Sequence, residues 1–392
     1  MTSRARTDWP AVVCAIALGV LAASYIGKLP PALPLMQREF GLELRQAGWV
    51  VAMFSALAMA TGLFFGLAAD RFGPFRMAVA GLVLLILGTY VGATASGGDA
   101  LLASRFLEGT GFIAVTLSAP SLIGVACAAS DLRKALGFWA IYMPLGGSLA
   151  MVLAPPVLAA SGWRALWWIG ALFTAVLAVA LAGLRERYRV ASAPTRRFTD
   201  LIAPLRRAAT WLFAAAFVFY AVQFFAVTVW LPTFLTSERG VSVGTASVLT
   251  GLVVFANVPG NLMATWLMQR HQVRRSALTI AAHLSMGGCA LAIFAGALPD
   301  WSRYAGCIGL SFLGGMLPTA ALSSAQVLAR TAVQIGGIQG LMVQASNLAQ
   351  FAGAPLIAAV VAASGWDAAL PVMLACALAG AGCGAAIRRT GI

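Results

Sequence analysis

Three ionisable side chains lie inside strongly apolar stretches of this sequence. Lys28 falls in the apolar stretch 9–36, and Arg105 and Glu108 fall in the stretch 100–127. A charge at the centre of a membrane helix costs about 2.5–3.5 kcal/mol on insertion scales, so such charges are functional candidates by default. A guanidinium can clamp an anion through two hydrogen bonds, a lysine can add a second positive charge, and a buried carboxyl can carry a proton. Together they favour anion binding by Lys28 and Arg105, with Glu108 as the proton-coupling acid.

A structural alternative for the same three residues stays open. Arg105 and Glu108 are three residues apart, a spacing at which side chains on one helix pair and neutralise each other. Lys28 lies near the end of its stretch and can extend its ammonium towards the membrane surface. In this interpretation the charges only support helix packing.

Uncharged polar residues in other apolar stretches form a second set of candidates. Their amides and hydroxyls either join membrane helices or line a polar cavity that faces the charged residues. We predict that the following residues contribute to a solute site: Tyr142, Tyr220, Gln223, Asn257 and Asn347. Asn347 shares a helical stripe with Gln344 and Gln350, because the three are spaced by three residues. His283 has only Met286 as a nearby ligand candidate and is interpreted as a packing or hydrogen-bonded histidine, not a metal ligand.

The composition predicts an integral membrane protein. Of the 392 residues, 61% are hydrophobic and 10% are charged, whereas soluble domains contain about 25% charged residues. The net charge of +14 is explained by arginines in short loops between apolar stretches, so we expect no nucleic-acid partner. None of the six cysteines forms a CxxC pair, and we expect no disulfide, metal or cofactor. The sequence also lacks a phosphate-binding glycine loop and a clustered catalytic set, which argues against an enzyme.

Twelve apolar stretches are long enough to cross a bilayer, for which about 20 helical residues are needed. Their approximate ranges are 9–36, 45–69, 77–96, 100–127, 135–160, 163–184, 210–235, 243–268, 276–298, 301–329, 334–363 and 366–387. An even number of crossings puts both termini on one side. With that side inside, the inner segments carry 19 basic residues and the outer segments 5, which predicts cytoplasmic termini. Because so many crossings follow, the first stretch is expected to be a retained membrane helix and not a cleaved leader.

The chain repeats itself with an offset of 202 or 203 residues. Leu29-Pro30 matches Leu231-Pro232, and Ser161-Gly162-Trp163 matches Ser364-Gly365-Trp366. We therefore predict an N-terminal six-helix bundle at 1–184, a basic cytoplasmic linker at 185–209 and a C-terminal six-helix bundle at 210–392. Parallel repeats of this kind place a substrate site near the bilayer midplane, where the halves meet.

Two motifs carry a family resemblance. Gly66-x-x-x-Asp70-Arg71-x-Gly73 resembles the signature between helices 2 and 3 of the major facilitator superfamily, although Pro74 replaces the usual basic residue. Arg105 followed by Gly109 and Gly111 resembles the superfamily's helix 4 signature. The resemblance implies an all-α membrane fold of 12 helices in two pseudo-symmetric six-helix bundles, with Arg105 facing the central cavity. It also implies a gating role for Asp70, Arg71 and Gly73.

A looser resemblance concerns one subgroup of that superfamily. Gly162-Trp163-Arg164, together with the Arg105–Gly111 run, is similar to bacterial cyanate and nitroimidazole permeases. The sequence thus predicts a monomeric, multi-pass permease of a bacterial-type inner membrane. It would move a small anionic organic solute by alternating access, as a proton symporter working in the direction of uptake. The alternative is a proton-coupled exporter of drugs or metabolites on the same fold.

Overall fold

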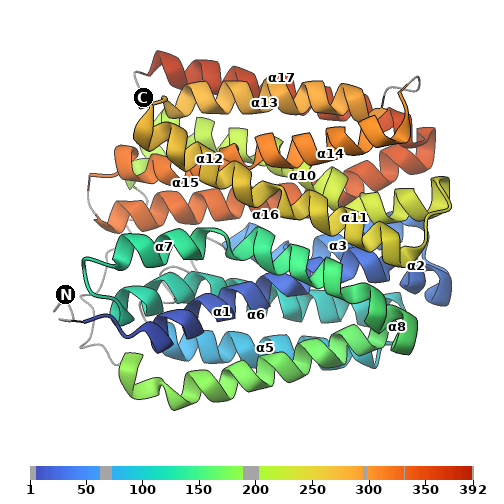
Figure 1. Cartoon of the computed structure of the whole chain (residues 1–392), viewed down its shortest axis with the longest axis horizontal. Coiled ribbons are helices and arrows are strands. Elements are labelled where there is room, and N and C mark those ends of the chain that lie inside the picture. The colour runs from blue at the N-terminus through green and yellow to red at the C-terminus, as the bar shows by residue number, and fades with distance from the viewer. Residues whose placement is uncertain (1–5, 62–72, 189–202, 295–297, 331, 391–392) are drawn as a thin grey trace.

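The computed structural model describes residues 6–61, 73–188, 203–294, 298–330 and 332–390, and within these ranges the regular structure is helical, without a strand. The long helices run roughly parallel to the long axis of the molecule (Figure 1). The first-half helices, blue to green, form one layer, and the second-half helices, yellow to red, form the other. Both chain ends lie at the same end of the molecule, which we call the terminal end.

The described first half contains seven α-helices with defined bounds, a short 3₁₀ turn and a helical stretch at residues 56–61. The elements with defined bounds are α1 (Trp9–Gly27), α2 (Leu29–Phe40), α3 (Leu44–Met53), α5 (Pro74–Ala93), α6 (Gly98–Ala126), α7 (Leu132–Ala140), α8 (Tyr142–Gly183) and η1 (Arg185–Tyr188).

The second half begins with a short 3₁₀ turn and continues through long helices. Its elements are η2 (Ala203–Arg206), α10 (Ala208–Glu238), α11 (Val243–Phe255), α12 (Asn257–Arg270), α13 (Arg275–Phe294), α14 (Asp300–Gly314), α15 (Met316–Leu328), α16 (Ala332–Ser364), η3 (Trp366–Ala368) and α17 (Ala369–Arg389).

The described helices account for the predicted crossings. Ten segments are long and apolar enough to span a membrane. One of them, Tyr142–Gly183, is two crossings merged across Gly162, whose φ of 71° and ψ of −179° interrupt the helix. The crossing predicted at 45–69 is described only in part, because residues 62–72 lie outside the described ranges. The architecture is therefore consistent with twelve crossings in the predicted all-α fold.

Proline and glycine set the breaks in these helices. Pro30 and Pro31 cannot donate backbone hydrogen bonds, and the first crossing divides at Lys28 into α1 and α2. The crossing also continues to Phe40, four residues beyond the predicted end. Gly162 and Gly365 both adopt a positive φ with an extended ψ, a conformation reserved for glycine. The repeated Ser-Gly-Trp sequence thus forms the same turn in each half.

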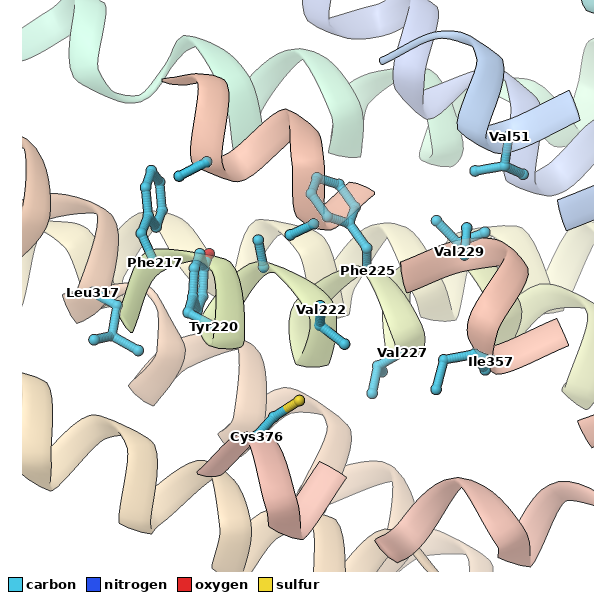
Figure 2. Packing of buried hydrophobic residues seen from close by; sticks show 14 of the residues in the cluster. Val51, Phe217, Tyr220, Val222, Phe225, Val227, Val229, Leu317, Ile357 and Cys376 are labelled. Atoms are coloured by element: carbon cyan, nitrogen blue, oxygen red, sulfur yellow. The ribbon is translucent and has the colours of Figure 1, made fainter. Parts of the chain in front are cut away.

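The two halves pack against each other through α3 with α16 and through α8 with α11. The apolar residue Val51 of α3 belongs to the same buried cluster as Val229 of α10 and Ile357 of α16, and Figure 2 shows these residues together with others of the cluster. A second buried cluster lies entirely within the first half. It includes residues of α1, which precedes Lys28, and of α6, which carries Arg105 and Glu108.

Candidate functional site

Lys28 lies at the break between α1 and α2 and points into the first half. Its side chain is 6% exposed, and its Nζ atom is 2.6 Å from Oε1 of Glu108. The ammonium also lies 4.0 Å from the ring centroid of Tyr25 and 4.3 Å from that of Trp167, both of which can hold a cation on their faces. Lys28 therefore does not extend to the membrane surface, and that alternative for this residue is wrong.

Arg105 and Glu108 occupy one face of α6. Nη1 of Arg105 is 2.5 Å from Oε2 of Glu108 and donates to the backbone oxygen of Tyr25 at 3.1 Å. The guanidinium also lies 4.4 Å above the ring of Phe54, which follows α3. Glycine at position 109 permits this approach, since a Cβ atom there would overlap the carbonyl of Phe54.

Together, Lys28, Arg105 and Glu108 form a buried group that we call the charged triad. Lys28 and Arg105 each engage a different oxygen of Glu108, and the hydroxyl oxygen of Thr89 of α5 lies 3.3 Å from Oε1. Glu108 is fully buried. Two cations against one carboxylate leave a formal excess of one positive charge away from water. Such an excess is costly unless a further partner compensates it, which makes the triad a candidate anion site.

Polar groups around the charged triad extend it across the first half. The hydroxyl of Tyr25 hydrogen-bonds that of Thr174 at 2.6 Å and accepts from Thr89 at 3.2 Å. Nε of Arg105 and Nε1 of Trp167 are buried without a hydrogen-bond partner in the described part of the chain. Unsatisfied buried donors are rare in folded proteins, so the site retains capacity for an acceptor such as a solute oxygen or water.

A different polar group lies in the second half. Nδ2 of Asn257 donates to the hydroxyl of Tyr220 at 3.1 Å and to the carbonyl of Ser311 at 3.0 Å. Asn261 donates to Oδ1 of Asn257 at 2.8 Å and accepts from Thr319 at 2.8 Å. This amide network joins α10, α12, α14 and α15 without any ionised residue. Two of the predicted solute-site residues, Tyr220 and Asn257, are thus brought together.

The other predicted solute-site residues are placed separately. Nε2 of Gln223 donates to Phe219 within α10, and its buried Oε1 has no partner among the described residues. Asn347 donates to the carbonyl of Val343 within α16. Tyr142 stacks on Trp139, with ring centroids 4.2 Å apart. The described contacts do not join these residues to the charged triad, and their role in solute binding stays a prediction.

One polar contact between the halves had not been predicted. Ser55, which follows α3, donates to Oε1 of Gln350, and both side chains are buried. Gln350 belongs to the same polar stripe of α16 as Asn347, so the sequence pattern did mark Gln350 as a candidate for a polar contact. Nothing in the local sequence marks Ser55 as its partner.

The repeated Ser-Gly-Trp turns also position unpredicted contacts at the end opposite to the terminal end. Nε1 of Trp163 donates to Glu39 at 2.6 Å, and Nε1 of Trp366 donates to Glu238 at 3.1 Å. In each half, the tryptophan ties the end of the first crossing to the start of the sixth. In the first half, Arg164 adds an ion pair to Glu39 at 2.6 Å. The repeat that matches Trp163 with Trp366 was the sequence feature from which this pair of contacts could have been predicted.

The predicted gating residues are described only in part. Asp70 and Arg71 lie outside the described residues. Gly73 caps α5 with a φ of 84°, a conformation that favours glycine.

His283 is buried against Gly380, and its ring nitrogens have no partner in the described structure. The described residues contain no cluster of ligating side chains for a metal ion, and the six cysteines are free thiols.

Curated proteins resemble parts of this chain in sequence. A multidrug transporter of Aspergillus fumigatus, mfsC, is 29% identical over 149 residues, covering 36% of this chain and 28% of its own length. A probable sulfoacetate transporter of Cupriavidus necator, SauU, is 25% identical over 269 residues, covering 64% of this chain and 62% of its own length. The chain thus spans less than two thirds of the length of the curated relatives it matches.

The fold comparison covers nearly the whole chain. A bacterial homologue of the human lysosomal transporter Spinster, solved in an inward-facing and unoccupied conformation, superposes with a TM-score of 0.80 and 15% identity. The alignment covers 97% of this chain and 96% of that one. The sequence profile of the Major Facilitator Superfamily matches residues 13–354. The chain therefore belongs to the Major Facilitator Superfamily.

Proposed function

We propose that this protein is a proton-coupled secondary transporter that takes up a small organic anion across a bacterial-type plasma membrane, with both termini in the cytoplasm. The observation that carries the proposal is the charged triad. Glu108 engages both Lys28 and Arg105. The carboxylate of a solute would therefore compete with that of Glu108 for the same two cations.

This competition supplies a coupling mechanism. While Glu108 is ionised, it occupies both cations and leaves only one net positive charge, so a solute carboxylate must compete with it for their hydrogen bonds. A proton on Glu108 removes the competing charge, so the two cations become available to an anion, and Arg105 can bind it through two hydrogen bonds. By linkage, the bound anion favours the proton on Glu108 to the same extent. Proton and anion would then bind, cross and leave together.

The buried position of the triad supports the requirement that Glu108 be protonated before the anion binds. An ion pair in low dielectric interacts strongly, so opening it without a proton is unfavourable. Anion transport should consequently be driven by a proton gradient that is acidic outside. The similarity to SauU, whose name specifies the anion sulfoacetate, is in line with this solute class.

The experiment is uptake into proteoliposomes with an imposed pH gradient. The panel contains sulfoacetate, monocarboxylates, nitrate and a neutral sugar. We expect an outside-acidic gradient to accelerate uptake of one or more organic anions and to leave the sugar outside. Carriage of only neutral or cationic compounds would overturn the proposal.

A matched pair of variants connects the result to the triad. Glu108→Gln imitates the protonated carboxyl permanently, so the variant should bind the anion but lose accumulation driven by the gradient. Glu186→Gln removes an exposed carboxylate of η1 outside the triad and should behave like the unmodified protein. Equal behaviour of the two variants would remove Glu108 from the mechanism.

Export is the second candidate function, because the chain also resembles the multidrug transporter mfsC. In that case Glu108 would exchange protons for an outgoing drug or metabolite. Deletion of the gene in its host should then increase sensitivity to several unrelated compounds. Unchanged sensitivity, together with anion uptake, would favour the first proposal.

A further inference from the structure

A cavity outside the transport site lies at the terminal end of the first half. Its volume is about 300 Å³, and it is lined by Phe75, Arg76, Val79, Ala80 and Arg185. The first four residues belong to the beginning of α5, and Arg185 opens η1. The surface of the cavity is almost entirely apolar, so the two arginines contribute to it mainly through their aliphatic stems.

The η1 wall is held in place by contacts with neighbouring helices. The hydroxyl of Tyr188 donates to the carbonyl of Ala11 at 2.6 Å, and Arg187 pairs with Asp8 at 2.9 Å. The ring of Tyr188 lies 6.3 Å from that of Phe75, measured between centroids. These contacts fix η1 against α1 and α5. Arg185 is thus presented to the cavity by a supported turn.

Among the described residues, the two arginines of the cavity have no anionic partner, whereas their neighbour Arg187 has one. Arg76 and Arg185 are exposed and make no ion pair or hydrogen bond within the described part of the chain, whereas Arg187 pairs with Asp8. Arg76 also lies in the first turn of α5, where the positive end of the helix dipole disfavours a cation and favours an anion. An anion bound beside the cavity, at the exposed guanidinium groups, would offset the charges of the two arginines and the helix dipole.

The position of the cavity identifies the kind of anion. α5 is a candidate membrane span over Pro74–Ala93, so its first turn lies where lipid headgroups meet the hydrocarbon region. Phe75, Val79 and Ala80 provide an apolar wall beside the arginines. A lipid with an acidic headgroup satisfies both parts, because its phosphate pairs with guanidinium groups and its acyl chains cover the apolar wall.

We propose that an acidic phospholipid binds here, with an acyl chain against the apolar cavity and its phosphate paired with the exposed guanidinium groups of Arg76 of α5 and Arg185 of η1. The bound phosphate would bridge the third crossing and the first residues of the connection between the two halves. The site is separate from the charged triad, and its occupancy does not depend on which solute is transported.

The test is binding of defined lipids to the full-length protein purified in a neutral detergent. Phosphatidylglycerol, phosphatidylcholine and inorganic phosphate are offered in parallel, and native mass spectrometry counts the retained ligand while thermal unfolding reports stability. We expect retention of phosphatidylglycerol and an increase in the unfolding temperature. Equal retention of phosphatidylcholine, or an equal effect of inorganic phosphate, would overturn the assignment to an acidic lipid.

Variants locate the binding. The double substitution Arg76→Gln with Arg185→Gln should lower phosphatidylglycerol affinity about tenfold or more, as expected for the loss of two charge-assisted contacts. Ala80→Trp should also weaken binding, because it fills the apolar wall without a change of charge. Arg388→Gln with Arg389→Gln removes two exposed arginines from the last turn of α17 and should leave binding unchanged. The proposal would be contradicted if both double arginine variants lost equal affinity for phosphatidylglycerol. It would also be contradicted if affinity were unchanged in the variant at Arg76 and Arg185, or in Ala80→Trp.

Discussion

The two halves of the molecule share their turns but differ in the chemistry of their buried polar groups. In the first half, Lys28, Arg105 and Glu108 form a charged triad. At the offset of 202 residues, their counterparts are Trp230, Cys307 and Leu310, all buried and uncharged. The second half instead holds the neutral amide network around Asn257. A repeat can therefore preserve the path of its helices while only one copy carries ionisable Lys, Arg and Glu side chains at these three positions.

The same contrast extends to the helices that carry these groups. The first crossing is divided at Lys28 beside Pro30 and Pro31, whereas α10 continues from Ala208 to Glu238 through its single interior proline, Pro232. The division places Lys28 at a helix junction. We infer that the first half supplies the proton-dependent step and that the second half supplies a neutral framework.

The largest effect should come from removal of the carboxylate. Glu108→Ala leaves Lys28 and Arg105 buried and unpaired, and breaking a buried ion pair in this way costs about 3–5 kcal/mol of unfolding free energy. Denaturant unfolding in detergent measures this loss. Asn257→Ala is the matched change in the second half. If the two variants lost equal stability, the distinction between the halves would fail.

Removal of the Lys28 cation should reduce anion uptake strongly while changing the free energy of unfolding only slightly. Lys28→Met leaves the neutral pair of Arg105 and Glu108 in an apolar surrounding, so unfolding should change by less than about 1.5 kcal/mol, as for other replacements that avoid a bare charge. Anion uptake should fall about a hundredfold, equivalent to about 2.7 kcal/mol of lost solute interaction. Proteoliposome uptake provides the measurement. Normal uptake by Lys28→Met would remove this residue from the solute site.

The amide network should affect stability without affecting the response to pH. Asn257→Ala removes bonds to Tyr220 and Ser311 in a buried position, for which we expect a loss of about 1–3 kcal/mol. The pH profile of uptake should keep its shape in Asn257→Ala and flatten in Glu108→Gln. A changed profile in the asparagine variant would assign proton coupling to both halves.

The repeated tryptophans should give the smallest effects. Trp163→Phe removes the indole donor to Glu39, a bond beside the Arg164 ion pair, and should cost about 1 kcal/mol. Trp366→Phe removes the longer and more exposed bond to Glu238 and should cost about half as much. Paired thermal unfolding measures the difference. A larger loss in Trp366→Phe would reverse this order.

Much of the fold followed from features that the sequence displays directly. Apolar length located the crossings, and the repeated Ser-Gly-Trp run located the positive-φ turns at Gly162 and Gly365. The three-residue spacing of Arg105 and Glu108 indicated their ion pair. The contact of Lys28 with Glu108 was harder to predict from the sequence, because it depends on how α1 packs against α6. Pairing across distant segments, as between Ser55 and Gln350, leaves no local pattern in the chain.

The role of the charged triad is tested most directly by counting protons. Isothermal titration of the purified protein, in buffers of different ionisation enthalpy, measures proton uptake when the anion selected by the uptake panel binds. We expect uptake of about one proton per anion in the unmodified protein near neutral pH and none in Glu108→Gln. Anion binding without proton uptake in the unmodified protein, or unchanged proton uptake in Glu108→Gln, would contradict the competition between the solute and Glu108.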